Sequence, residues 1–154
     1  MTVQSIETKV GSLLRPEVLA LSAYPVQDAT GLIKLDAMEN PYHWPETMID
    51  DWLGTLRTAQ INRYPDPSAD RLRAALSLAY SVPAGAELML GNGSDELIQI
   101  ILMAVGGDDA VVLAPHPTFV MYRQIALSLG QVFVGVDLQG DDFSLDMQAM
   151  RKAN

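Results

Sequence analysis

Hydrophobic side chains in the first half of the chain recur at the spacing of a helix. Apolar residues at i, i+3, i+4 and i+7 share one face of a helix, and two such stripes run through residues 49–56 and 72–80. Ser68 stands where the N-cap of the second helix is expected. The remaining pattern before residue 87 is weaker. It predicts a short apolar helix at residues 10–20, a short strand at 32–35, and proline-rich loops at 38–45 and 62–67.

After residue 87 the apolar runs alternate between strand length and helix length. The pattern predicts strands at residues 87–90, 110–114 and 131–138, and helices at 94–105, 118–129 and 146–152. Such alternation predicts an α/β fold with a mostly parallel sheet and right-handed crossovers. Because these sheets bind ligands at the carboxyl ends of their strands, the loops at residues 91–96 and 114–119 become the candidate site.

The composition supports a folded domain and limits its partners. The chain has 154 residues, 49% of them hydrophobic, which suits one domain with a core. A net charge of −9 disfavours nucleic acids and anionic membranes as partners. There is no cysteine and there are only two histidines, so disulfides are excluded and no metal site is expected. Without a visible signal peptide or a long apolar run, we expect a cytoplasmic protein.

Residues 91–96 read Gly-Asn-Gly-Ser-Asp-Glu and join a predicted strand to a predicted helix. The first amides of a helix lack partners within it, and the helix dipole favours negative charge there. A phosphate at this point would be held by the amides of Gly93, Ser94 and Asp95 and by the Ser94 hydroxyl. The same residues also suit an ordinary helix start in which Ser94 is the capping residue. The glycine patterns of P-loop and dinucleotide-binding proteins are absent.

The loop after the next strand reads Pro-His-Pro-Thr-Phe at residues 115–119. Two prolines stiffen it, and Phe119 would then lie at the same end of the sheet as Ser94. An aromatic ring there suits a flat heteroaromatic ligand, although a place in the core is the alternative. His116, between the prolines, is expected at the surface rather than in catalysis.

Four segments together carry a family resemblance. They are residues 35–42 (LDAMENPY), 62–67 (NRYPDP), 91–96 (GNGSDE) and 115–122 (PHPTFVMY). In this order and spacing they resemble the histidinol-phosphate aminotransferases, members of the fold-type-I pyridoxal-phosphate enzymes, over nearly the whole chain. The resemblance implies an incomplete large domain in residues 32–154, a mostly parallel sheet with flanking helices, preceded by an N-terminal arm in residues 1–31.

The resemblance also assigns roles to individual residues. It implies that Gly93, Ser94 and Asp95 cradle the phosphate of pyridoxal 5'-phosphate and that Phe119 stacks on the pyridine ring, where many relatives have tyrosine. Tyr64 matches a tyrosine that reaches the cofactor phosphate of the other subunit, which implies a homodimer. Two more residues match positions at the substrate pocket, Tyr24 in the arm and Asn40 in its bordering loop.

The reaction implied by the resemblance is amino transfer in histidine biosynthesis. Glutamate would donate its amino group through the cofactor to imidazole acetol phosphate, giving histidinol phosphate and 2-oxoglutarate. These small molecules are then the expected partners of the full-length homodimer, with no role for nucleic acid or membrane.

The lysine that forms the Schiff base in this family has no match in the chain. Lys9 and Lys34 lie early in the sequence, and Lys152 belongs to the last predicted helix. The resemblance therefore places no catalytic residue in this chain, since covalent catalysis of this kind requires that lysine. We expect an N-terminal fragment of an enzyme that is inactive and prone to aggregate by itself.

Three alternatives remain open from the sequence. A threonine-phosphate decarboxylase or an aromatic aminotransferase would share the phosphate loop and the stacking ring. A non-catalytic α/β module that binds a phosphorylated ligand would not need the missing lysine. A nucleotide-binding Rossmann domain is disfavoured by the absence of its glycine fingerprint.

Overall fold

The computed structural model of the chain describes residues 5–22, 28–107, 109–140 and 142–153. Contacts divide the chain into two compact units, Met1–Tyr24 with Met89–Asn154, and Pro25–Leu88. Each unit is described by itself. The expected division into an arm of residues 1–31 and large-domain residues 32–154 stays a prediction.

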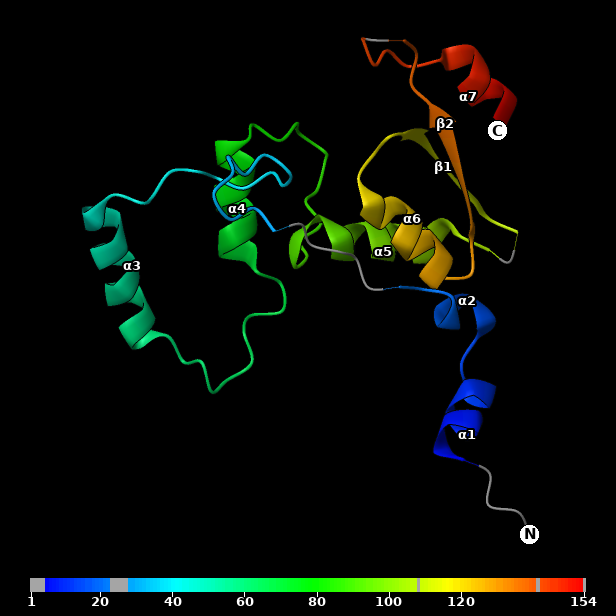
Figure 1. The fold of residues 1–154 in the computed structure, drawn as a ribbon. Helices are drawn as coiled ribbons and strands as arrows, with labels where there is room; N and C mark the ends of the chain where they lie inside the picture. Colours follow the sequence, from blue (N-terminus) through cyan, green and yellow to red (C-terminus); the bar gives the residue numbers. More distant parts are fainter. Residues whose placement is uncertain (1–4, 23–27, 108, 141, 154) are drawn as a thin grey trace. The chain divides into compact units, whose positions relative to one another are not determined.

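The first unit is built on two parallel strands, β1 (Val111–His116) and β2 (Val132–Asp137). Their register runs from Val111 opposite Val132 to His116 opposite Asp137. The crossover between them is α6 (Val120–Ser128), and α5 (Gly93–Val105) precedes β1 (Figure 1). The last helix, α7 (Met147–Ala153), contacts both strands. The predicted α/β alternation with parallel strands is therefore present in this unit.

The core of this unit lies between the sheet and α6. Its buried hydrophobic residues, among those described, are Ala114 of β1 with Ile125 and Ala126 of α6. Gln131 is also buried, and its side-chain amide donates to the Leu102 carbonyl of α5 at 2.9 Å. This hydrogen bond connects the end of α5 to the start of β2, across 29 residues of sequence.

The helix predicted at residues 10–20 is two helices, α1 (Ile6–Leu13) and α2 (Pro16–Leu19). Pro16 explains the break, because a proline disfavours helical backbone in the residue before it, and Arg15 is extended with ψ 142°. Ser5 caps α1 by accepting a hydrogen bond from the Thr8 amide at 3.2 Å. The Arg15 guanidinium donates to the Ser128 carbonyl at the end of α6.

The second unit contains α3 (Glu46–Thr58) and α4 (Asp70–Ala79), the two helices predicted from the apolar stripes. Neither has a buried residue, so the stripes identified the helices without a packed core in this unit. Trp44 and Trp52 meet edge to face, with ring centroids 5.8 Å apart.

Three local predictions were wrong. Ser68 does not cap α4, because its own amide and hydroxyl donate to the Asp66 carboxylate and the N-cap position is taken by Ala69 in the left-handed region. The expected strands at residues 32–35 and 87–90 are irregular. A strand exists only with a partner for its backbone hydrogen bonds, and the sheet of the described residues consists of β1 and β2.

Candidate functional site

The segment at residues 91–96 turns sharply into α5. Gly93 has φ +83°, a left-handed conformation that glycine adopts without strain. The Glu96 carboxylate reaches back and accepts a hydrogen bond from the Asn92 amide at 2.5 Å. Glu96 thereby satisfies the amide of Asn92, the N-cap residue, and its negative charge lies at the start of the helix.

The amides of the first helical turn are the chief feature of this site. The Gly93 amide donates to the Gly91 carbonyl at 3.0 Å, whereas the amides of Ser94 and Asp95 have no acceptor among the described residues. Two N–H groups at a helix N-terminus, reinforced by the helix dipole, form a binding place for an anion.

Ser94 is not the capping residue that an ordinary helix start would require. The N-cap position belongs to Asn92, and it makes no side-chain capping bond. The Ser94 hydroxyl is exposed, and its one hydrogen-bond contact within the described part of the chain is with the carboxylate of Asp95 at 3.4 Å. The hydroxyl therefore remains available as a further donor beside the two amides.

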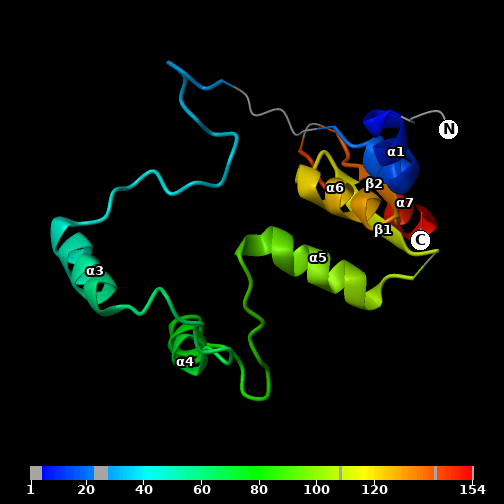
Figure 2. The same ribbon diagram turned by 90° about the horizontal axis from the view of Figure 1, so that it is seen from below.

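Phe119 lies at the N-cap position of α6 and does not belong to the core. Its side chain is 48% exposed, and its ring meets that of Tyr122 edge to face at 5.8 Å. Helices α5 and α6 contact each other, and in Figures 1 and 2 they begin on the same side. The structure thus brings an exposed aromatic ring and the start of α5 to one side of the same helix pair.

The strand ends beside Phe119 hold a polar pair that the sequence did not predict. His116 ends β1 and Asp137 ends β2, and their side chains lie 3.0 Å apart, Nδ1 to Oδ1. The sequence singles out His116 as a surface residue and does not single out Asp137. Only the strand register, which places the two opposite each other, identifies the pair.

The candidate residues of the second unit lie in exposed loops. Tyr64 is fully exposed. The Asn40 side-chain oxygen accepts a hydrogen bond from the Tyr42 amide at 3.0 Å, which tightens the loop that contains it. Tyr24, the remaining candidate, lies outside the described residues.

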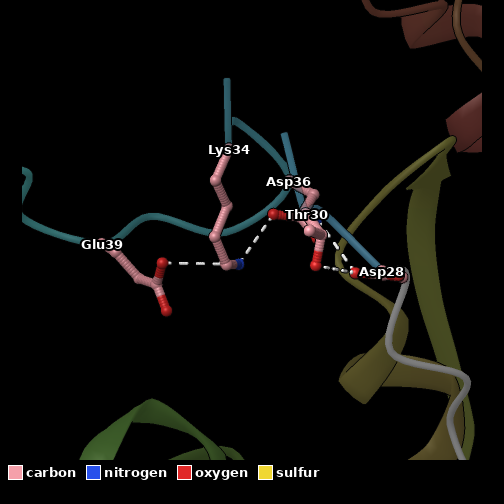
Figure 3. Close-up of polar contacts among 5 residues, drawn as sticks. All are labelled: Asp28, Thr30, Lys34, Asp36 and Glu39. Atoms are coloured by element: carbon pink, nitrogen blue, oxygen red, sulfur yellow. Dashed lines mark hydrogen bonds and ion pairs between the residues drawn. The ribbon is translucent and has the colours of Figure 1, made fainter. Parts of the chain in front are cut away.

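The segment before Asn40 is held by short-range charges (Figure 3). The ammonium of Lys34 lies 2.8 Å from Asp36 and 3.3 Å from Glu39. The Asp36 carboxylate raises the pKa of Lys34, and the Lys34 ammonium in turn lowers the pKa of Asp36. Thr30 lowers the pKa of Asp28 by donating its hydroxyl hydrogen to the carboxylate. Lys34 is therefore a protonated structural partner in this loop.

Two other kinds of site find no support in the described ranges. They contain no group of three metal-binding side chains, and no helix in them is long and apolar enough to cross a membrane.

Comparison with known proteins decides the family. No family model matches the chain. A histidinol-phosphate aminotransferase 2 from Nitrosococcus oceani is 55% identical over 92% of the chain, which spans 39% of that relative. A histidinol-phosphate aminotransferase from Thiocapsa roseopersicina is 51% identical over 94% of the chain, which spans 76% of that relative. The chain belongs to the histidinol-phosphate aminotransferase family.

A solved aminotransferase structure shares the fold of this chain. A kynurenine aminotransferase from Pyrococcus horikoshii, solved in complex with PMP, matches 97% of the chain with a TM-score of 0.63 at 16% identity. The chain covers 40% of that protein. The predicted α/β aminotransferase fold and the family resemblance are thus both confirmed, and the chain spans about two fifths of the length of several of its relatives, such as the one from Ralstonia nicotianae (40%).

Aminotransferases of this fold use pyridoxal phosphate, and the chain's own residues fit one end of it. The cofactor carries a phosphate and a flat heteroaromatic ring. The start of α5 offers amides without acceptors and a hydroxyl for the phosphate, and Phe119 offers an exposed ring for the heterocycle.

Proposed function

We propose that the chain forms the cofactor-phosphate wall of an aminotransferase that makes histidinol phosphate. The enzyme would move the amino group of glutamate to imidazole acetol phosphate and release 2-oxoglutarate. The observation that carries this proposal is the pair of amides without acceptors at Ser94 and Asp95, in a chain of the histidinol-phosphate aminotransferase family.

The start of α5 would bind the cofactor through its phosphate. The amides of Ser94 and Asp95 donate to phosphate oxygens, and the helix dipole favours the negative charge. The Ser94 hydroxyl adds a third donor, and the Gly93 backbone sets the turn that exposes these groups. Binding by fixed backbone amides orients the phosphate without loss of side-chain freedom.

Phe119 would lie against the pyridine ring and hold it in one plane. An exposed aromatic ring at a helix start provides a flat apolar surface at little conformational cost. When bound, pyridoxal phosphate supplies the electron sink on which amino transfer depends. The contribution of these residues is to fix that group's position and orientation.

The remaining candidates would contribute to the substrate pocket and to the cofactor site of the other subunit. We propose that Asn40, in a loop stabilised by its bond to the Tyr42 amide, borders the substrate pocket, and that Tyr24 lines it. Tyr64 would reach the cofactor phosphate of the other subunit of a homodimer. Its full exposure agrees with a role in contacts outside its own unit. A cytoplasmic location remains an expectation from the sequence.

The test measures cofactor affinity and amino transfer in a matched pair of serine variants. In the protein expressed from its complete reading frame, Ser94→Ala removes one donor to the phosphate, and Ser12→Ala removes a hydroxyl that donates to the Lys9 carbonyl. A hydrogen bond to a charged group contributes about 1.5–3 kcal/mol. We therefore expect Ser94→Ala to weaken cofactor binding roughly 10- to 100-fold, with Ser12→Ala unchanged.

The substrate is tested in the same assay. Formation of 2-oxoglutarate from glutamate and imidazole acetol phosphate supports the proposal. Release of carbon dioxide from threonine phosphate, or amino transfer only to aromatic oxo acids, would instead select one of the two neighbouring activities.

A further inference from the structure

The carboxyl ends of β1 and β2 are joined twice, by backbone and by side chains. The Leu138 amide donates to the His116 carbonyl at 2.8 Å, which extends the parallel ladder by one bond. The imidazole Nδ1 of His116 lies 3.0 Å from the Asp137 carboxylate, between register partners. Both side chains are exposed, His116 by 63% and Asp137 by 89%, so packing in a core does not force them together.

Gly135 lies beside the Cβ of His116 on the neighbouring strand. A Cβ built at Gly135 would lie 3.3 Å from the Cβ of His116 and 3.8 Å from its Cγ. Gly135 is two residues before Asp137, so both lie on the same face of β2. The Asp137 carboxylate therefore approaches the His116 ring from the same face of β2 as Gly135 and contacts its Nδ1 at 3.0 Å.

The geometry points to His116 and Asp137 as a clasp that positions Phe119 for stacking on the cofactor ring. Only Pro117 and Thr118 separate His116 from Phe119, and Pro117 fixes its own φ. A strand end held by the clasp therefore sets the path of the chain into α6, where Phe119 is the N-cap residue. This inference rests on the proposed function for the role of the Phe119 ring, but not for the clasp itself.

The expected effect of the clasp is modest. Ion pairs and hydrogen bonds between exposed side chains contribute little, because water and salt compete for both groups. Loss of the clasp should therefore shift the Phe119 ring slightly and weaken binding of the cofactor ring about two- to fivefold. The phosphate amides of Ser94 and Asp95 belong to another helix and should not respond.

The first experiment compares two ligands that differ in the ring. Affinities for pyridoxal phosphate and for inorganic phosphate are measured by calorimetry on the complete protein and its variants. Asp137→Leu and His116→Leu should weaken pyridoxal phosphate two- to fivefold and leave inorganic phosphate unchanged. Asp137→Asn should restore binding, since its side-chain oxygen still accepts from Nδ1–H. The control is Asp50→Leu, an equal loss of charge at an exposed residue of α3 in the other unit.

Equal weakening of both ligands would overturn the positioning role, because it would indicate general damage to the fold. Unchanged affinity for pyridoxal phosphate in both leucine variants would overturn it as well. If the unmodified protein bound neither ligand, the proposed function would fail. The second experiment would still test whether His116 and Asp137 position Phe119.

The second experiment needs no ligand. The complete protein is labelled with 4-fluorophenylalanine, and the fluorine resonances of Phe119 and Phe143 are assigned by their loss in Phe119→Leu and Phe143→Leu. Asp137→Leu should shift or broaden the Phe119 resonance and Asp137→Asn should return it, while Phe143 outside the two strands stays fixed. A Phe119 resonance that is the same in all three proteins would contradict the clasp.

Discussion

At the scale of single residues, the site depends on which donors already have acceptors. The Asn92 amide is satisfied by the Glu96 carboxylate and the Gly93 amide by the Gly91 carbonyl. Ser94 and Asp95 follow directly in the chain, and their amides lack acceptors among the described residues. The sequence predicted a helix that starts in this loop, but it could not divide the loop's amides into satisfied and available ones, because that depends on the turn at Gly93.

Gln131 gives a second test at this scale. It is 7% exposed, and its Nε2 donates to the Leu102 carbonyl. Gln131→Glu would place a buried carboxylate against that carbonyl, and an unsatisfied buried group costs about 1–3 kcal/mol, more when it is charged. We expect a loss of that size or larger in the free energy of unfolding at neutral pH. Chemical denaturation measures it.

The control for this variant is Gln99→Glu, the same change at an exposed position of α5. We expect a change within about 0.5 kcal/mol there. An equal effect of both substitutions would contradict the buried hydrogen bond between α5 and β2.

At the scale of elements, periodicity predicted the helices better than it predicted their ends or the strands. The stripes in residues 49–56 and 72–80 became α3 and α4, because an amphipathic face is a property of the segment itself. The apolar run at residues 87–90 did not become a strand, because a strand depends on a neighbour elsewhere in the chain. The pairing of His116 with Asp137 could not be predicted for the same reason, because it depends on the register of β1 and β2.

Asp146 provides a prediction about how an element begins. Its carboxylate accepts from the amides of Ala149 at 2.8 Å and Gln148 at 3.0 Å in the first turn of α7. The Ala149 amide is the first cause that lowers the pKa of Asp146 below its ordinary value of 3.8. A lowered pKa in the folded state means that the carboxylate stabilises the helix at neutral pH and loses this effect as the pH falls below 3.8 through the folded-state pKa.

Hydrogen exchange at the Ala149 amide measures this directly. Protection should decrease as Asp146 becomes protonated, and Asp146→Ala should remove the protection at neutral pH. Asp146→Asn, which keeps an acceptor but does not titrate, should exchange at a rate without this acid transition. Persistent protection of Ala149 in the alanine variant would rule out the cap.

At the scale of the whole molecule, much apolar surface is left without a partner in the described residues. The buried hydrophobic residues are Ala114, Ile125 and Ala126, whereas large side chains such as Leu78, Met103 and Val105 are mostly exposed. Exposed apolar surface of this extent favours association. The sequence predicted the strand at residues 110–114 and the helices beside it, but in β1 Ala114 is buried while Val111 is 54% exposed, because burial depends on more than the chain's own periodicity.

The 154-residue chain studied alone should therefore self-associate and show no amino transfer. None of its lysines matches the cofactor lysine of the family, and Lys34 is held as a cation by Asp36 and Glu39. Light scattering measures self-association, and formation of 2-oxoglutarate from glutamate measures amino transfer. A monomer with turnover would contradict both expectations.

An amide titration tests most directly whether the amides of Ser94 and Asp95 bind the cofactor phosphate. The ¹⁵N-labelled protein is titrated with pyridoxal phosphate while the backbone amide shifts are recorded. We expect the largest shifts at Ser94 and Asp95, with saturation at the same ligand concentration and a parallel response of the Phe119 ring. Saturable binding that leaves the amides of Ser94 and Asp95 unchanged, or no binding at all, would contradict it.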